Sequence, residues 1–191
     1  MKRALLILSP GFEEMEAVAP LDLLRRAGIE TVAASAGPAL EVEGGRGIKL
    51  KADCMLADCP RAKFDLLILP GGPGVDGMRQ NPAVLELVRQ FHAEGKPIAA
   101  ICAAPLVLAD AGVLTGRRVT SFPGSRAGLE GRIGSYSEDR IVSDGNIITS
   151  RGAGTAEEFA LALVELLAGT DAAEDVRMRI VARPRQSPRP G

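Results

Sequence analysis

Short apolar runs alternate along this chain with longer stretches of helical periodicity, and few folds accommodate that order. Runs rich in Leu, Ile, Val and Ala are typical of strands that are buried on both faces, as in a parallel sheet covered by helices. We therefore predict an α/β fold with helices on both sides of a mostly parallel sheet. The predicted strands lie at residues 4–8, 31–35, 65–69, 97–101, 119–122, 141–142 and 147–149.

The predicted helices cover residues 14–27, 82–94 and 156–168. A glycine follows the last turn of each one, which is a common way for a helix to end. The Asp144-Gly145 step predicts a hairpin between the last two strands, and hence an antiparallel edge on the sheet. The glycine-rich section at 40–51 alternates only in part, and its pattern does not decide between strand and loop.

The length and charge of the chain limit its organisation and its partners. A chain of 191 residues is expected to form one domain, which we place at residues 1–170. The 23 basic and 24 acidic side chains leave a net charge of −1, so we expect no binding to nucleic acid or to an anionic membrane. Residues 171–191 are predicted to be a basic, Pro-rich tail that extends into solvent, or alternatively an arm that docks on a second subunit.

The cysteine count and the N-terminus bear on the compartment. The apolar run after Met1-Lys2-Arg3 is too short for a signal peptide or a membrane span. Three cysteines are an odd number, which favours reduced thiols in the cytoplasm over a disulfide framework. Cys54 and Cys59 lie close in sequence, but with a single histidine in the chain we expect no structural zinc. We predict no metal and no other cofactor.

Candidate site residues follow three of the predicted strands. Ligands of a parallel α/β sheet bind beyond the carboxyl ends of its strands. The segments that begin there are 11–16, 70–72 and 102–104. The sequence therefore predicts that these three segments meet at one edge of the sheet.

Cys102 stands between a buried strand and a helix that Pro105 helps to start. The unpaired amides and the dipole at a helix N-terminus favour a thiolate, so we expect the thiol pKa to lie below its ordinary value of about 8.5. The flanking alanines suit a tight turn that resembles a nucleophile elbow. The alternative is a small buried hydrophobic residue without a chemical role.

Glu16 is the candidate partner of this thiol. Pro20 lies four residues later and cannot donate a hydrogen bond to the carbonyl of Glu16, so the helix is expected to be distorted there. A buried glutamate has a raised pKa and could stay protonated to act as a proton donor. The alternative is an ordinary solvated helix residue, as we expect Glu13 and Glu14 to be.

Two further features decide which chemistry is available. Gly71 and Gly72 permit close approach, so backbone amides here could bind an oxyanion beside the thiol. His92 lies in the last turn of a predicted helix, at the opposite end of the strand that leads to Cys102. Without a Cys–His dyad, the general base of cysteine proteases and amidases is missing, and we do not favour those activities.

Five segments together resemble the ThiJ/PfpI superfamily, in the branch of the parkinsonism-associated deglycase and the bacterial YajL-like proteins. The similarity covers residues 3–169, and the combination of segments is specific. In order along the chain, the segments are SPGFEEMEAV, LILPGGPG, AAICAAP, TSFPG and TSRGAGTAEEFALALVELL.

The resemblance implies a flavodoxin-like three-layer α/β/α sandwich that forms a homodimer. It also assigns roles to residues. Cys102 matches the family's readily oxidised nucleophile, Glu16 its protonated partner, and the amides of Gly72 and Ala103 its oxyanion-binding positions. Arg26 and Arg46 are similar to arginines of relatives that lie near the dimer interface and bind anions beside the site.

One position departs from the pattern of the human-like members. Those members have His before the Pro that follows the cysteine helix, whereas this chain has Phe122-Pro123. The bacterial members are similar to this chain here, so the departure affects the mechanism and not the fold. Any step that needs a histidine proton shuttle is in question.

Two functional hypotheses follow, and both use Cys102 and Glu16. The first is a cysteine-dependent glyoxalase or deglycase that acts on methylglyoxal, glyoxal or their early adducts and protects against carbonyl and oxidative stress. The second is a non-enzymatic, redox-sensing chaperone that responds to oxidation of Cys102. The expected partners are a second copy of the chain and a small carbonyl substrate.

Overall fold

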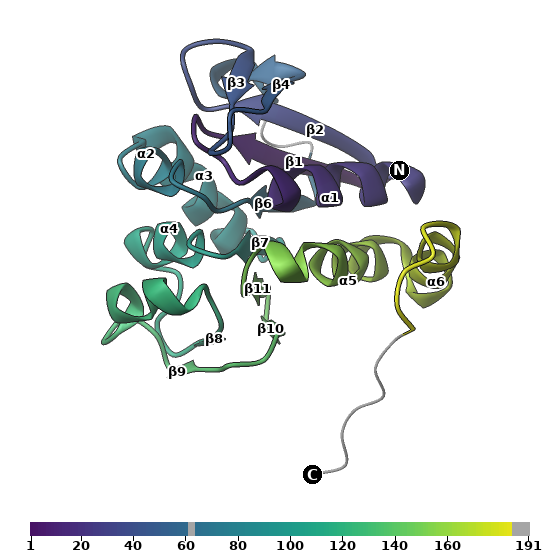
Figure 1. Cartoon of the computed structure of the whole chain (residues 1–191). Helices are drawn as coiled ribbons and strands as arrows, with labels where there is room; N and C mark the ends of the chain where they lie inside the picture. Colours follow the sequence, from purple (N-terminus) through teal and green to yellow (C-terminus); the bar gives the residue numbers. More distant parts are fainter. Residues whose placement is uncertain (61–63, 185–191) are drawn as a thin grey trace.

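Seven strands form the central sheet of the computed structural model, which describes residues 1–60 and 64–184 (Figure 1). Their order is β10-β11-β7-β6-β1-β2-β5. The strands are β1 (Arg3–Leu8), β2 (Glu30–Ser35), β5 (Cys54–Met55), β6 (Leu66–Leu69), β7 (Ile98–Ile101), β10 (Ile141–Asp144) and β11 (Ile147–Ser150). Neighbouring strands are parallel except β10 and β11, which form the predicted antiparallel edge hairpin.

Helices cover both faces of this sheet, so the predicted three-layer α/β/α sandwich is confirmed (Figure 1). Side chains of β1 alternate between two hydrophobic clusters, because successive residues of a strand point to opposite faces. Leu5 and Ile7 belong to one cluster, and Leu6 and Leu8 to the other. The helices on the first face are α2 (Val75–Arg79), α3 (Pro82–Ala93) and α4 (Pro105–Asp110), and those on the second are α1 (Glu14–Arg26), α5 (Ala156–Ala168) and α6 (Thr170–Arg179).

The predicted strand at 119–122 is wrong. Only β8 (Arg118–Val119) is extended there, and it pairs with β9 (Ser135–Tyr136) outside the central sheet. Strand β11 lies beside β7 in the central sheet. The Thr120 amide does not bond to a strand backbone there but donates to the Thr149 side chain of β11 at 3.0 Å. The undecided section at 40–51 contains a small hairpin of β3 (Glu41–Glu43) and β4 (Lys49–Lys51).

The predicted tail begins with a helix. Most of α6 lies within residues 171–191, and Ala173 and Val176 are buried in the cluster that also contains α1 and α5. These two apolar residues explain why the segment docks, although its overall composition is basic. The chain therefore forms a docked helix up to Arg179, and not the predicted solvated extension from residue 171. Residues 185–191 lie outside the part of the chain that the structure describes.

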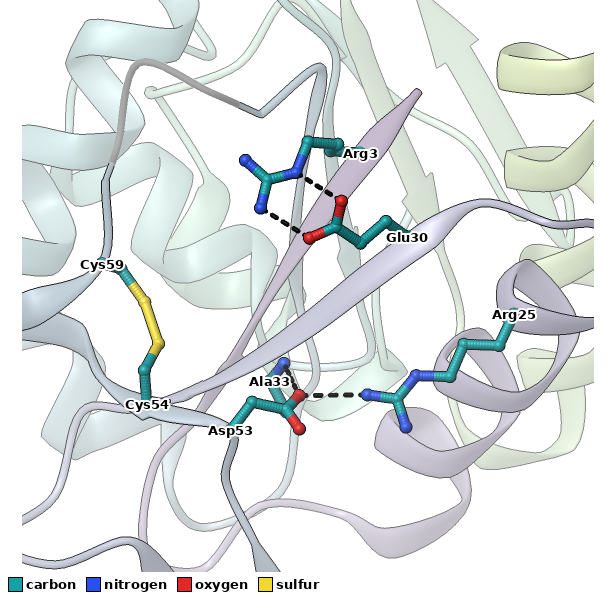
Figure 2. Close-up of a disulfide and its surroundings, with 7 residues drawn as sticks. All are labelled: Arg3, Arg25, Glu30, Ala33, Asp53, Cys54 and Cys59. Atoms are coloured by element: carbon teal, nitrogen blue, oxygen red, sulfur yellow. Dashed lines mark hydrogen bonds and ion pairs between the residues drawn. A yellow bond between two sulfur atoms is a disulfide. The ribbon is translucent and has the colours of Figure 1, made fainter. Parts of the chain in front are cut away.

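Cys54 and Cys59 form a disulfide, which corrects the expectation of three reduced thiols (Figure 2). The single turn of 3-10 helix at Leu56–Asp58 brings the two Cα atoms to 6.5 Å, within the range that a disulfide spans. Asp53, next to Cys54, accepts a hydrogen bond from the Ala33 amide and pairs with Arg25, which ties this edge to β2 and α1. A cytoplasmic location stays a prediction.

Counting thiols tests the disulfide. Alkylation of the denatured but unreduced protein is expected to modify Cys102 alone, because Cys54 and Cys59 are bonded to each other. Reduction before alkylation should expose all three thiols. Intact-mass spectrometry reads both results, and three alkyl groups on the unreduced protein would show that the bond is absent.

Candidate active site

Cys102 occupies a strained turn between β7 and α4. Its φ is 65°, in the left-handed region that residues other than glycine and asparagine seldom adopt. Backbone bonds on both sides hold it there: its amide donates to the Ser150 carbonyl at 2.9 Å, and its carbonyl accepts from the Phe122 amide at 2.8 Å. The expected nucleophile-elbow geometry is therefore present, and the thiol projects from the carboxyl end of the sheet.

Two glycines after β6 let the chain pass close to this thiol. A Cβ on Gly71 would lie 2.6 Å from the Cβ of Cys102 and 2.7 Å from Oε2 of Glu16, so no side chain fits between the two groups. Gly72 has a φ of 91°, and a Cβ there would lie 2.6 Å from the Glu13 amide. The amides of Gly72 and Ala103 donate hydrogen bonds to the sulfur of Cys102.

Glu16, in the first turn of α1, is fully buried beside Cys102. Its Oε2 accepts a hydrogen bond from the Gly71 amide at 2.8 Å, and its carboxyl is hydrogen-bonded to the thiol. A Cβ on Gly152 would lie 3.9 Å from both the Cys102 sulfur and Oε1 of Glu16, so these two atoms border the same small space. The helix continues through Pro20 without a break.

Burial raises the pKa of both acids of the site, Glu16 and Cys102. Burial raises the pKa of Glu16 to about 7, against the hydrogen bonds from Gly71 and Cys102 that lower it. Burial first, and the charge of Glu16 second, raise the pKa of Cys102 to about 12, although the amides of Ala103 and Gly72 lower it. The pair therefore retains one proton at neutral pH.

The direction of the Glu16 shift is as the sequence predicts, but the expectation of a lowered thiol pKa is wrong. That expectation took account of the helix N-terminus and ignored the loss of water around the sulfur. Helix α4 is only six residues long, and burial beside a carboxylate outweighs its dipole. The resting site is thus a thiol next to a carboxyl group that ionises near neutral pH.

A cavity of about 540 Å³ opens above Cys102 and Glu16. Of the two predicted anion-binding arginines, Arg46 lines this cavity and Arg26 does not. Arg26 pairs with Asp22 on α1 and lines a separate groove of about 620 Å³ between α1, α5 and α6. Arg26 does not reach the cavity above Glu16 because it lies almost three helical turns from Glu16 along α1.

Three residues near Cys102 and Glu16 have surroundings that the sequence pattern does not predict. Glu14 is only 6% exposed, and its Oε1 accepts from the Arg46 amide at 2.6 Å, so it is not a solvated helix residue. Glu13 caps α1 by accepting from the Glu16 amide at 2.8 Å. Phe122 lines the cavity and is 49% exposed, whereas His92 lies in the last turn of α3 and is not part of the lining.

The sequence reasoning missed Arg140 and Arg151, which also line the cavity. Arg151 immediately follows β11, whose last residue bonds to the Cys102 amide, so the rule about strand ends could have found it. Arg140 precedes β10 and pairs with Glu158 at 2.8 Å. Among the described residues, no group of three or more His, Cys, Asp or Glu side chains is arranged to hold a metal ion.

The chain is similar in sequence and in fold to known proteins. Residues 2–166 match the DJ-1/PfpI family. The chain is 43% identical to Protein dj-1beta of Drosophila melanogaster over 92% of this chain and 94% of that protein. The crystal structure of Drosophila melanogaster DJ-1beta superposes on it with a TM-score of 0.92, at 41% sequence identity, over 96% of this chain and 99% of that chain. It is also 36% identical to the glutathione-independent glyoxalase DJR-1.2 of Caenorhabditis elegans, over 89% and 91% of the two chains.

Proposed function

Because this chain belongs to the DJ-1/PfpI family, we propose that it is a glyoxalase in which Cys102 is the nucleophile and Glu16 moves the proton. The observation that carries the proposal is the contact of the Cys102 thiol with the Glu16 carboxyl and two backbone amides on the floor of a cavity. The glyoxalase activity in the name of the nematode relative supports the same reaction. The substrates are methylglyoxal and glyoxal, and early adducts of these would be a further class.

The first step joins sulfur to the aldehyde carbon. Ionised Glu16 accepts the thiol proton while the sulfur attacks, so no free thiolate is needed. The carbonyl oxygen then gains the charge, and the amides of Gly72 and Ala103 are placed to stabilise it. Glu16 then donates this proton to the oxygen, so the product of this step is a neutral hemithioacetal on Cys102 beside an ionised Glu16.

The second step moves hydrogen between the two oxygen-bearing carbons. Glu16 removes the proton from the former aldehyde carbon and returns it to the ketone carbon through an enediol, which leaves a thioester. Water then releases lactate and the free thiol. Overall, methylglyoxal and water give lactate, with one carbon oxidised and its neighbour reduced, so no external oxidant or reductant is required.

Counting product per thiol separates the enzyme from the redox-sensing alternative. A glyoxalase is expected to form many equivalents of lactate per Cys102, whereas a sensor or a scavenger stops at about one equivalent per thiol. Lactate is assayed against protein with the thiol titrated first. A plateau at one equivalent would reject turnover and favour the redox-sensing chaperone. A role in protection from carbonyl and oxidative stress extends the same proposal.

The homodimer is a further part of the proposal, with α1 in the interface. Met15 and Val18 are 57% and 43% exposed on α1, and both line the groove beside α5 and α6. Apolar side chains in such a groove are typical of a surface that another protein covers. Light scattering at micromolar concentration should give twice the chain mass of 20.0 kDa, and a monomeric mass would contradict this.

Within the described residues, no helix has the length and apolar character needed to cross a membrane.

A further inference from the structure

Three arginines line the cavity above Cys102, and their guanidinium groups differ in how they are paired. Arg140 donates to both carboxylate oxygens of Glu158, at 3.0 and 2.8 Å, and its charge is compensated. The guanidinium of Arg46 donates to the Gly45 carbonyl, and that of Arg151 to the Glu138 carbonyl at 2.8 Å. In the part of the chain that the structure describes, neither guanidinium forms an ion pair, so the lining includes two arginines whose charge no carboxylate compensates.

The acids in the same lining do not cancel these charges directly. The carboxylate of Glu13 accepts from the Glu16 amide, and that of Glu14 accepts from the Arg46 amide. Glu16 is fully buried and is hydrogen-bonded to Gly71 and to the thiol. These carboxyl groups are directed at protein amides or at the sulfur, which leaves the guanidinium groups for a ligand.

Of the three arginines, Arg151 is connected most directly to Cys102 through the backbone. It follows Ser150, which bonds to the Cys102 amide across β11 and β7. It is half-buried, so an anion that it binds is partly removed from water, where a guanidinium–oxyanion pair is stronger. Arg46 reaches the cavity from the turn between β3 and β4.

The size of the cavity also points beyond methylglyoxal. A volume of about 540 Å³ is typical of sites for ligands much larger than a three-carbon dicarbonyl. A guanidinium presents two parallel N–H groups that match a carboxylate or a phosphate. A substrate that fills the cavity would therefore place such a group near Arg151 while its aldehyde carbon reaches Cys102.

We infer that the preferred substrates are α-oxoaldehydes with an oxyanion at the far end, which Arg151 binds with help from Arg46. This deepens the proposed glyoxalase function and rests on it. The reaction balances as before: R–CO–CHO and water give R–CHOH–COO⁻ and a proton, and the distal carboxylate or phosphate is unchanged.

Matched substrates test the preference. The pair 4,5-dioxopentanoate and its methyl ester differ mainly in charge, and 3-phosphooxy-2-oxopropanal supplies the phosphate arm. One charged hydrogen-bonded contact is worth about tenfold or more, so kcat/KM for the acid should exceed that for the ester by about tenfold. Comparing the carboxylate and phosphate arms then decides which oxyanion fits better. Equal kcat/KM for acid and ester would overturn the inference.

Variants assign the preference to Arg151. Arg151→Gln should bring the acid and the ester within about twofold of each other by lowering kcat/KM for the acid, and Arg151→Lys should restore part of the preference. Arg26→Gln is the matched control, because Arg26 lies outside this cavity, and it should keep the wild-type ratio. An equal loss for both substrates in Arg151→Gln would mean that Arg151 supports the fold of the site and does not select the anion.

A second readout does not depend on turnover. N-Iodoacetylglycine and its methyl ester have nearly the same shape, but only the acid is charged, at the end remote from the reacting carbon. The ratio of their rate constants for alkylating Cys102, acid over ester, should be about tenfold higher in the wild type than in Arg151→Gln. If no substrate is turned over but this ratio shifts, the glyoxalase proposal fails and the anion site stands. An unchanged ratio removes the anion site whatever the enzyme does.

Discussion

Replacement of Glu16 by glutamine is expected to lower kcat/KM for methylglyoxal by about 10²–10⁴-fold, the usual contribution of a general base. Glutamine fits the same space and can still accept a hydrogen bond from the Gly71 amide, so the fold of the site is kept. It cannot accept the proton of Cys102. Steady-state lactate formation by both proteins measures the loss, and a change of less than about threefold would exclude Glu16 as the base.

The same pair of proteins should differ in pH dependence. Wild-type kcat/KM should rise as the pH increases through about 7, because Glu16 acts as a base only after it ionises. In Glu16→Gln the rise should move to more alkaline pH, where the buried thiol itself begins to ionise. A wild-type profile that is flat from pH 5.5 to 8 would show that a thiolate exists before the substrate arrives.

Glu13→Gln is a suitable control for these profiles. Glu13 lines the same cavity, and glutamine can still cap α1 at the Glu16 amide. The charge of Glu13 raises the pKa of Glu16, so its removal should shift the rise in kcat/KM to slightly lower pH and leave the plateau in place. A large loss of the plateau would mean that Glu13, and not Glu16 alone, handles the proton.

The Glu16→Gln variant should also be more stable than the wild type at alkaline pH, although it is less active. Between pH 4.5 and about 7 the native protein holds a proton on Glu16 that the unfolded chain has released. The native state therefore loses free energy of unfolding as the pH rises. From pH 5 to pH 8, the ionisation of Glu16 lowers the free energy of unfolding of the wild type by about 2–3 kcal/mol. Glutamine does not ionise, so the variant does not lose this free energy.

Denaturant unfolding at the two pH values tests the sign and the size of this effect. The stability of Glu16→Gln relative to the wild type should increase by about 2–3 kcal/mol between pH 5 and pH 8. Other titrating groups affect both proteins equally and cancel in the difference. A relative stability that stays constant, or that falls towards pH 8, would mean that Glu16 has an ordinary pKa in the folded protein.

Much of the fold could be predicted because buried parallel strands leave a strong pattern in the sequence. The apolar runs at 4–8, 31–35, 65–69 and 97–101 coincide with β1, β2, β6 and β7, and the glycine stops mark the ends of α1, α3 and α5. Strand order follows from the same rules only in part. The prediction of a strand at 119–122 is wrong because Val119 packs in the core without joining the main sheet, and Phe122 is half-exposed. The rule about strand ends points to the segments 11–16, 70–72 and 102–104, and the roles of Glu16 and Gly72 within them come from the family resemblance.

The remaining features depend on contacts that no local pattern encodes. The burial of Glu14 requires the β3–β4 hairpin to fold over α1, and the Cys54–Cys59 bond requires one turn of 3-10 helix between the cysteines. The pKa of Cys102 depends on burial, which outweighs the nearby helix end. The resemblance names Arg26 and not Arg151, and no local pattern shows which arginine lines the cavity above Cys102.

In the proposed reaction, the Cys102 sulfur forms a bond with the substrate in each turnover. Lactate formation from methylglyoxal by Cys102→Ser, measured beside the wild type at pH 8, is the sharpest check, because serine keeps the shape of the turn but is a far weaker nucleophile. We expect a loss of more than about 10³-fold in kcat, with the cavity intact. A Cys102→Ser protein that forms lactate within about tenfold of the wild-type rate would contradict it.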